Sequence, residues 1–339
     1  LNLEGMIVSN PVNIKYLTNI ESEGTLLITR KENIFLTYTM FLEDVNRTLT
    51  IDDEIIAADM RDISSEEAQN FFVFCENIGF EESYVTYEQY KRLKQRYRIN
   101  NMVETEGIIE RQRMIKDEEE IENIKKACEI TDKCFEHLLT YIKEGMTEKQ
   151  IALEIEIFFK TNGAEGNSFD PIVASGPNSS IPHWKPSNRK IQMADPILID
   201  MGCKYKGYCS DMTRTIFMGC LLEEIKPIYD LVLKNQKNVL EEARSNYNIK
   251  TLSRMVDDSF RFNNYTLIHG LGHGVGLEIH EMPNINSKSE SFLKENMVVT
   301  DEPGIYLPGR YGIRIEDTVL ITKTECISLT KSSKEYVVI

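Results

Sequence analysis

Long apolar segments are absent from this sequence. No stretch approaches the roughly 18 consecutive apolar residues that a membrane-spanning helix needs. The N-terminal residues also lack the order of basic, then apolar, then small residues that marks a secretory signal peptide. We therefore expect a soluble, cytoplasmic protein with no membrane partner.

Paired cysteine motifs and an excess of basic charge are also missing. The seven cysteines show neither CxxC spacing nor a regular framework, which is typical of reduced thiols in the cytosol. The 39 Lys and Arg are outnumbered by 54 Asp and Glu, so the formal charge is −15. Because phosphate contact needs clustered Lys and Arg, nucleic acid is not an expected partner. A basic run from Lys91 to Arg98 is interpreted as the solvated face of a helix.

The chain length and the order of its patterns predict two domains. The 339 residues suffice for about two units of roughly 150 residues. The first stretch alternates short strands and helices, which indicates an α/β domain. The patterns predict strands at residues 6–8, 25–29 and 34–37 and a helix at residues 65–79. A break follows at residues 111–116.

Capping-box signatures mark the helices that follow the break. Asp117 with Glu120, and Thr147 with Gln150, each precede apolar residues at helical spacing. A third helix is expected at residues 222–243. Because strand-like segments lie between and after these helices, we predict an α+β second domain with an antiparallel sheet.

Two pairs of acidic residues stand on either side of a histidine- and glycine-rich run. Asp200 and Asp211 lie in apolar segments joined by a polar turn, and Glu302 and Glu316 are symmetric about Gly309. We expect each pair to form a hairpin with directly opposed carboxylates, whose Cβ atoms would be about 4.5 to 5.5 Å apart. Like charges so placed repel, so they require a cation between them or a proton on one of them.

The histidine- and glycine-rich run at residues 269–276 supplies a neutral nitrogen ligand, His273. Its glycines leave room for close approach of backbone and substrate, but the third glycine of a dinucleotide fingerprint is missing. His137, on a predicted helix, is interpreted as structural. The other four of the five histidines fall within the same third of the chain: His183, His269, His273 and His280.

Four carboxylates and one imidazole form an oxygen-rich set of candidate metal ligands. Such a set suits Mn²⁺ better than the sulfur-rich or three-histidine sets that Zn²⁺ commonly favours. Two ions are the natural count, because bridging carboxylates hold metals roughly 3.5 to 4 Å apart in hydrolytic sites. We expect two divalent ions, Mn²⁺ first, with Co²⁺, Zn²⁺ or Fe²⁺ as alternatives. The candidate ligands are Asp200, Asp211, His273, Glu302 and Glu316.

Four motifs fall in the second part of the chain. They are Asp200-x-Gly202 continuing to Asp211-x-Thr213-Arg214-Thr215, the run from His269 to Glu281, Glu302-Pro303-Gly304-Ile305-Tyr306, and Arg314-Ile315-Glu316-Asp317. In type, order and spacing they resemble the pita-bread metallopeptidases, the family of proline dipeptidase, aminopeptidase P, methionine aminopeptidase and creatinase. The first domain, including residues 13–18, is similar to the creatinase-type N-terminal domain.

The resemblance implies a fold and its boundaries. Residues 1–113 would form a creatinase-like N-terminal α/β domain, and residues 114–339 a pita-bread catalytic domain. The second would be α+β, with a curved antiparallel sheet and covering helices. Members of this architecture usually form dimers, so a homodimer is expected.

The resemblance also implies which ligands bind each of the two metal ions. Asp200 and Asp211 would chelate one ion, with Asp211 also reaching the other. His273 and Glu302 would complete the second ion, and Glu316 would bridge both. A metal-bridging water or hydroxide would attack the scissile carbonyl, and Glu302 would shuttle its proton.

The remaining candidate residues are assigned by the resemblance to the substrate or to support of the ligands. His183 and His280 would contact substrate and stabilise the tetrahedral intermediate, and His269 would line the pocket near the proline. Three further residues would orient the ligands and His280 from behind: Tyr306, Thr213 and Arg314, the last also contacting substrate.

Hydrolysis of an Xaa-Pro bond is the predicted reaction. A methionine aminopeptidase would normally lack the N-terminal domain and carry Gln near the position of Arg314, so the imidoprolyl branch is favoured. We expect an Xaa-Pro dipeptidase acting on small peptides with proline second. An Xaa-Pro aminopeptidase acting on longer peptides is the alternative. A non-catalytic peptide-binding or scaffold member of the fold is the hypothesis from a different class.

Overall fold

The computed structural model describes residues 2–49 and 54–339, which form two compact units. Unit 1 extends to Gln112, and unit 2 runs from Arg113 to Ile339. Each unit has its own buried apolar core. Among the helices in these described ranges, none combines the length and apolar character that a membrane crossing requires.

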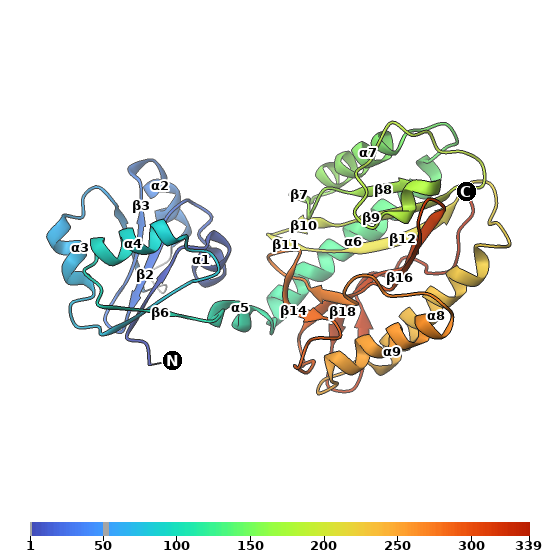
Figure 1. Ribbon diagram of the computed structural model, residues 1–339. Helices are drawn as coiled ribbons and strands as arrows, with labels where there is room; N and C mark the ends of the chain where they lie inside the picture. Colours follow the sequence, from blue (N-terminus) through green and yellow to red (C-terminus); the bar gives the residue numbers. More distant parts are fainter. Residues whose placement is uncertain (1, 50–53) are drawn as a thin grey trace. The chain divides into compact units, whose positions relative to one another are not determined.

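Unit 1 is built around a six-stranded mixed sheet (Figure 1). The elements in chain order are β1 (Gly5–Val8), α1 (Pro11–Thr18), β2 (Thr25–Thr29), β3 (Asn33–Thr37), α2 (Thr39–Thr48), β4 (Ile55–Asp59), α3 (Ser65–Phe71), β5 (Asn77–Phe80), α4 (Tyr87–Arg96) and β6 (Asn101–Glu104). The strand order is β4-β3-β2-β1-β5-β6. One face packs on α3 and α4 and the other on α1 and α2, because successive side chains of a strand point to opposite faces.

The three strands predicted in unit 1 are confirmed, but the predicted helix at residues 65–79 is wrong at its end. The helix ends at Phe71, and Gly79 lies in β5. A Cβ at position 79 would lie 2.9 Å from side-chain atoms of Leu3 and Thr105. The glycine therefore permits close packing beside a strand rather than ending a helix. The basic run that begins at Lys91 lies on and just after α4, and most of its side chains are exposed.

The described strands of unit 2 form four sheets, and a helix pair packs on each of two of them (Figure 1). Its main elements are α6 (Glu118–Tyr141), α7 (Glu148–Thr161), β7 (Gly166–Asn167), β8 (Ile172–Ser175), β9 (Pro196–Met201), β10 (Cys203–Tyr205), β11 (Tyr208–Cys209), β12 (Met212–Phe217), α8 (Lys226–Glu242), α9 (Ile249–Phe262), β13 (Gly272–Gly274), β14 (Glu281–Ile285), β15 (Val298–Asp301), β16 (Gly304–Leu307), β17 (Tyr311–Arg314), β18 (Asp317–Ile321) and β19 (Cys326–Ser328). Helices α6 and α7 pack on the sheet β12-β9-β8, and α8 and α9 on the sheet β14-β13-β15-β18-β19. Neighbouring strands in both sheets are antiparallel, as predicted.

The helix signals in unit 2 are confirmed, with one omission. Both capping boxes form at the predicted residues, at the starts of α6 and α7. The third predicted helix is α8. Helix α9 was not predicted, although Leu252, Val256 and Phe260 recur every fourth residue and are all buried.

Threonine hydroxyls join β12 to the β17–β18 segment, and we call this contact the threonine seam (Thr213, Thr215 and Thr318). Thr318 Oγ1 accepts from the Asp211 amide at 3.1 Å and donates to the Asp211 carbonyl at 2.7 Å. Thr215 Oγ1 makes the same two bonds to the backbone of Arg314, at 3.3 and 3.1 Å. The side chains thus replace a regular strand ladder where the two sheets meet.

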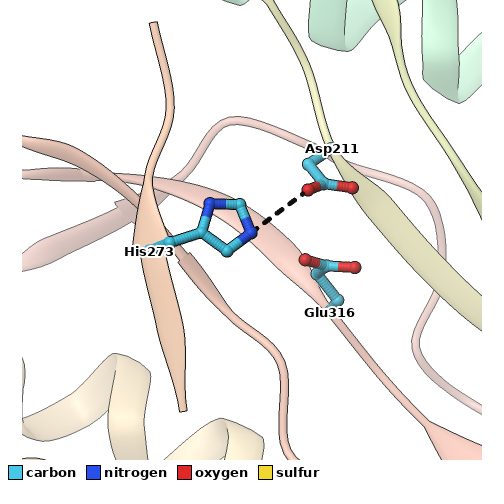
Figure 2. A group of neighbouring side chains, drawn as sticks. All are labelled: Asp211, His273 and Glu316. Atoms are coloured by element: carbon cyan, nitrogen blue, oxygen red, sulfur yellow. Dashed lines mark ion pairs between the residues drawn. The ribbon is translucent and has the colours of Figure 1, made fainter. Parts of the chain in front are cut away.

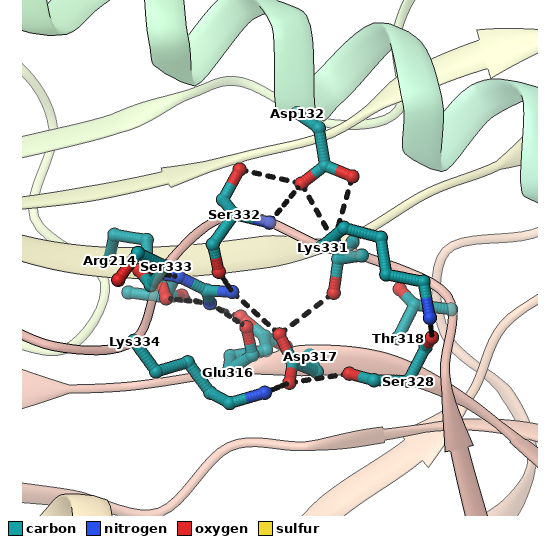
Figure 3. A network of polar contacts seen from close by, with 12 residues as sticks. Asp132, Arg214, Glu316, Asp317, Thr318, Ser328, Lys331, Ser332, Ser333 and Lys334 are labelled. Atoms are coloured by element: carbon teal, nitrogen blue, oxygen red, sulfur yellow. Dashed lines mark hydrogen bonds and ion pairs between the residues drawn. The ribbon is translucent and has the colours of Figure 1, made fainter.

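A buried ion cluster lies directly behind the threonine seam (Figure 3). Arg214 is 1% exposed and Asp317 is fully buried, and Arg214 Nη2 donates to Asp317 Oδ1 at 2.7 Å. Arg214 also donates to the Glu316 carbonyl, and Lys334 Nζ donates to Asp317 Oδ2 at 2.5 Å. Burial alone would raise the pKa of Asp317, but Arg214 and Lys334 outweigh it and lower that pKa to about 2.

Removing the cation of this cluster should destabilise unit 2. In Arg214→Met, Asp317 keeps its charge in a buried position and loses its main partner, so we expect the free energy of unfolding to fall by about 3–5 kcal/mol. Urea unfolding followed by fluorescence of Trp184, the only tryptophan, reports on this unit.

The matched control for that experiment is Lys237→Met. Lys237 forms an exposed ion pair with Glu335, and such pairs contribute at most about 1 kcal/mol. Equal effects of the two substitutions would contradict a central role for the Arg214–Asp317 pair.

Candidate metal centre

The first acid pair lies on one sheet face, but its predicted register is wrong. Asp200 pairs with Thr213 across β9 and β12, not with Asp211. The hairpin turns at Lys206 and Gly207, whose φ angles of 48° and 80° are both left-handed. A two-residue turn of this kind shifts the register by two residues from the predicted one. Asp211 therefore lies diagonal to Asp200 rather than opposite it.

The second acid pair has the predicted register. Asp301 pairs with Asp317 on one side of it and Gly304 with Arg314 on the other. Both pairings are symmetric about the same turn, so Glu302 and Glu316 stand opposite each other between them. Both glutamates lie between strands, so neither belongs to the described strand pairs whose backbone hydrogen bonds flank them.

The glycine-rich run brings His273 to the acids on strand β13. A Cβ at Gly272 would lie 2.1 Å from the carbonyl oxygen of Thr300, and one at Gly274 would lie 2.2 Å from that of Met282. Both positions therefore require glycine, as the predicted close backbone approach demands. The amide of His273 donates to Thr300 Oγ1 at 3.0 Å, which fixes the backbone that carries the imidazole.

Three of the predicted ligands form a tight group (Figure 2). Single ligand atoms of Asp211, His273 and Glu316 all lie within 4.8 Å of one another. His273 Nε2 is 3.5 Å from Asp211 Oδ2 and also 3.5 Å from Glu302 Oε1. Asp200 lines the same cavity as these three residues, and Arg314 Nη2 donates to its Oδ2 at 2.5 Å.

The electrostatics of the group favour a bound cation. Burial and the adjoining carboxylates hold the pKa of Asp211 and of Glu316 well above the ordinary values. Desolvation raises the pKa of Glu302 to about 7, and burial lowers that of His273 to about 4. Asp200 Oδ1 and Asp211 Oδ1 are buried with no hydrogen-bond partner in the described chain. Unpartnered carboxylate oxygens beside a neutral imidazole fit a divalent metal site.

Arg314 holds the site from behind. Its guanidinium donates to Asp200, to Thr213 Oγ1 at 3.0 Å and to Tyr306 Oη at 2.8 Å. Tyr306 Oη lies 3.0 Å from His269 Nε2. Thr213 Oγ1 donates to Glu316 Oε2 at 2.5 Å. The buried guanidinium of Arg314 thus links the two acid pairs to Tyr306 and His269.

A cavity of about 570 Å³ opens onto the candidate ligands. All five of them line it, and so do four of the predicted substrate residues: His183, His269, His280 and Arg314. The ring of His280 lies 4.3 Å from that of His273, and desolvation lowers the pKa of His280. Tyr306 and Thr213 are not among the lining residues. His137 lies on α6 and contacts Glu154 at 2.7 Å, away from this cavity.

Sequence reasoning missed Glu148, which anchors one wall of the cavity. This carboxylate is fully buried at the first turn of α7. Its oxygens accept from the amides and hydroxyls of Ser175 and Ser187 at 2.7 to 2.9 Å and from Trp184 Nε1 at 2.9 Å. The segment that carries His183 is therefore held in place. The capping box of Thr147 and Gln150 encloses Glu148 but gives no sign of these contacts.

Known proteins resemble both units. Residues 122–323 match the model of metallopeptidase family M24, and residues 1–115 match the creatinase/prolidase N-terminal domain. An Xaa-Pro dipeptidase of Pyrococcus furiosus is 35% identical, over 98% of this chain and 95% of its own. An Xaa-Pro dipeptidase structure from Bacillus anthracis is 33% identical with a TM-score of 0.93, covering 99% and 95%. An X-Pro aminopeptidase structure from Thermotoga maritima is 32% identical with a TM-score of 0.91, covering 100% and 98%.

The raised carboxyl pKa values predict that metal binding depends on pH. A cation must displace the protons held by Glu302 and its neighbours, so affinity should rise from pH 6 to pH 8. Each proton released makes the affinity change about tenfold per pH unit below the pKa of its group. Titration calorimetry with Mn²⁺ in buffers of different ionisation enthalpy measures both affinity and released protons. A pH-independent affinity without proton release would contradict the proposed ligand set.

Proposed function

The chain belongs to metallopeptidase family M24 and is a metallo-exopeptidase, and from this premise we propose that it is an Xaa-Pro dipeptidase. Family membership confirms the predicted resemblance and the fold class, a creatinase-type N-terminal domain followed by an M24 catalytic domain. The observation that carries the proposal is that four carboxylates and one imidazole meet in a single cavity, together with three further histidines. Similarity to relatives named Xaa-Pro dipeptidase supports the substrate class.

The family implies divalent metal ions, and five residues would hold two of them: Asp200, Asp211, His273, Glu302 and Glu316. We propose Mn²⁺ because the set is rich in carboxylate oxygens. When bound, such ions polarise a carbonyl and lower the pKa of water. The unpartnered oxygens of Asp200 and Asp211 support this assignment.

The remaining side chains of the cavity would bind and orient a peptide. Glu302 lies at the cavity wall beside His273 and would accept a proton from the attacking water and return it to the leaving amine. His183 and His280 would donate to the oxyanion that develops on the scissile carbonyl. His269 would contact the proline ring, and its link through Tyr306 to Arg314 would fix its orientation.

Xaa-Pro aminopeptidase remains the second candidate, because the Thermotoga maritima structure of that name is nearly as similar as the dipeptidase structure. A non-catalytic scaffold role is disfavoured, since all five ligand positions carry ligand-type side chains. We further propose that residues 1–113 and 114–339 act as the two domains and that the protein forms a homodimer.

Loss of one metal ligand should abolish hydrolysis without unfolding the chain. We expect Asp211→Asn to reduce Ala-Pro turnover by more than the roughly 10- to 100-fold typical of losing a hydrogen-bond partner of a ligand. Release of proline measures the rate, and circular dichroism checks the fold. Asp258→Asn, an exposed acid on α9, is the control. Unchanged activity in Asp211→Asn would refute the site.

Substrate length separates the two candidate activities. A dipeptidase must close its pocket after the second residue, so we expect Ala-Pro to be cleaved at least about tenfold more efficiently than Ala-Pro-Ala, a preference worth about 1.4 kcal/mol. Values of kcat/KM with Mn²⁺ present provide the measurement. Efficient release of alanine from the tripeptide would favour the aminopeptidase.

A further inference from the structure

Among the lysines and arginines of the described chain, Lys185 is the one at the cavity wall that remains available to a ligand. Two such residues line the cavity, Lys185 and Arg314. Arg314 is buried and already donates to Asp200, Thr213 and Tyr306. No hydrogen bond or ion pair joins the ammonium group of Lys185 to any described residue, and its side chain is exposed.

The backbone at Lys185 is fixed on both sides. Trp184, the residue before it, and Ser187, two residues after it, are both held by Glu148 Oε2. Distances from Glu148 are 2.9 Å to Trp184 Nε1, 2.9 Å to the Ser187 amide and 2.7 Å to the Ser187 hydroxyl. The backbone of Lys185 is therefore held in place at the cavity wall, while its long side chain leaves the ammonium group free to adopt several positions.

Apart from Lys185, Arg314 and the histidines, the ionisable side chains that line the cavity are carboxylic acids. Besides the four ligand carboxylates, Asp170 lines it. A free carboxylate entering this space meets repulsion unless a cation faces it. Two divalent ions would offset the ligand carboxylates, and Lys185 would then supply the one remaining mobile positive charge.

We propose that Lys185 binds the free carboxylate of the substrate's second residue and so selects dipeptides. The inference rests on the proposed peptidase function and deepens it, because a dipeptide carries a carboxylate directly after its proline and a longer peptide carries a neutral amide there. An ammonium–carboxylate hydrogen bond is charge-assisted and therefore stronger than a bond to an amide oxygen. Lys185 acts in recognition and leaves the bond-breaking step to other residues.

The test compares Ala-Pro with Ala-Pro amide, which lacks the negative charge. In Lys185→Met we expect KM for Ala-Pro to rise about tenfold to a hundredfold, the range for a lost hydrogen bond to a charged group. The kcat should change less than threefold, and KM for the amide less than twofold. If the amide is not turned over, its inhibition constant against Ala-Pro replaces KM. Lys185→Arg should restore most of the dipeptide affinity, since it keeps the charge.

The controls separate the role of Lys185 from the proposed dipeptidase function on which it rests. Lys190→Met removes an exposed lysine that does not line the cavity and should leave both substrates unaffected. A wild-type protein that binds the amide as tightly as the dipeptide, or a Lys185→Met variant that weakens both equally, overturns the role of Lys185 alone. A wild-type protein that fails to hydrolyse Ala-Pro with Mn²⁺ overturns the proposed function and this inference with it.

Discussion

The threonine seam is the contact on which the candidate metal centre depends. Asp211 directly precedes β12 and Glu316 directly precedes β18, and these strands belong to different sheets, so ordinary strand pairing does not bring the two acids together. Thr318 holds the backbone of Asp211 through two hydrogen bonds, and Thr213 donates directly to the carboxylate of Glu316. Because a hydroxyl both donates and accepts, Thr215 and Thr318 each satisfy a backbone amide and a backbone carbonyl that would otherwise be buried without partners. The sheets can therefore meet without a continuous ladder, and the gap in the ladder is where the carboxylates collect.

Crowding four carboxylates in this space costs free energy, and the protein offsets only part of it. Among the described residues, Arg314 is the one buried guanidinium that reaches both acid pairs, directly at Asp200 and through Thr213 at Glu316. Burial and, after it, the remaining repulsion between the carboxylates raise the pKa values of Asp211, Glu302 and Glu316. A site with this much uncompensated charge stabilises the folded chain more when cations occupy it, since ligands that bind only the native state shift the folding equilibrium toward it.

Much of the site could be predicted from residue type and order, whereas its exact register could not. Apolar segments joined by a short turn identified both hairpins, and the symmetry about Gly309 located the pair of glutamates correctly. The predicted register of the aspartate pair was wrong because the position of its turn depends on which residues adopt a positive φ. Lys206 adopts one, although lysine is not a residue type that favours this conformation. Contacts between residues far apart in the sequence could not be predicted either. Nothing local marks Glu148 as the anchor of Ser175, Trp184 and Ser187, or Thr318 as a partner of Asp211, because these contacts join segments far apart in the sequence.

The alternation of side chains along a strand explains why ligand and supporting residues are adjacent in the sequence. Thr213 and Glu316 meet on the cavity side of the seam, and their neighbours Arg214 and Asp317 meet behind it. Arg214 also donates to the carbonyls of Thr213 and Glu316, so the ion cluster fixes the backbone of the site residue Glu316 and of its hydrogen-bond partner Thr213. Lys334 extends this support to the C-terminal segment, which crosses behind the seam to reach Asp317 (Figure 3). The position of Glu316 thus depends on residues that never touch the cavity. The Glu-Asp motif encodes one cavity group and one supporting ion, and the Thr-Arg motif encodes a hydrogen-bond partner of that cavity group and the second supporting ion.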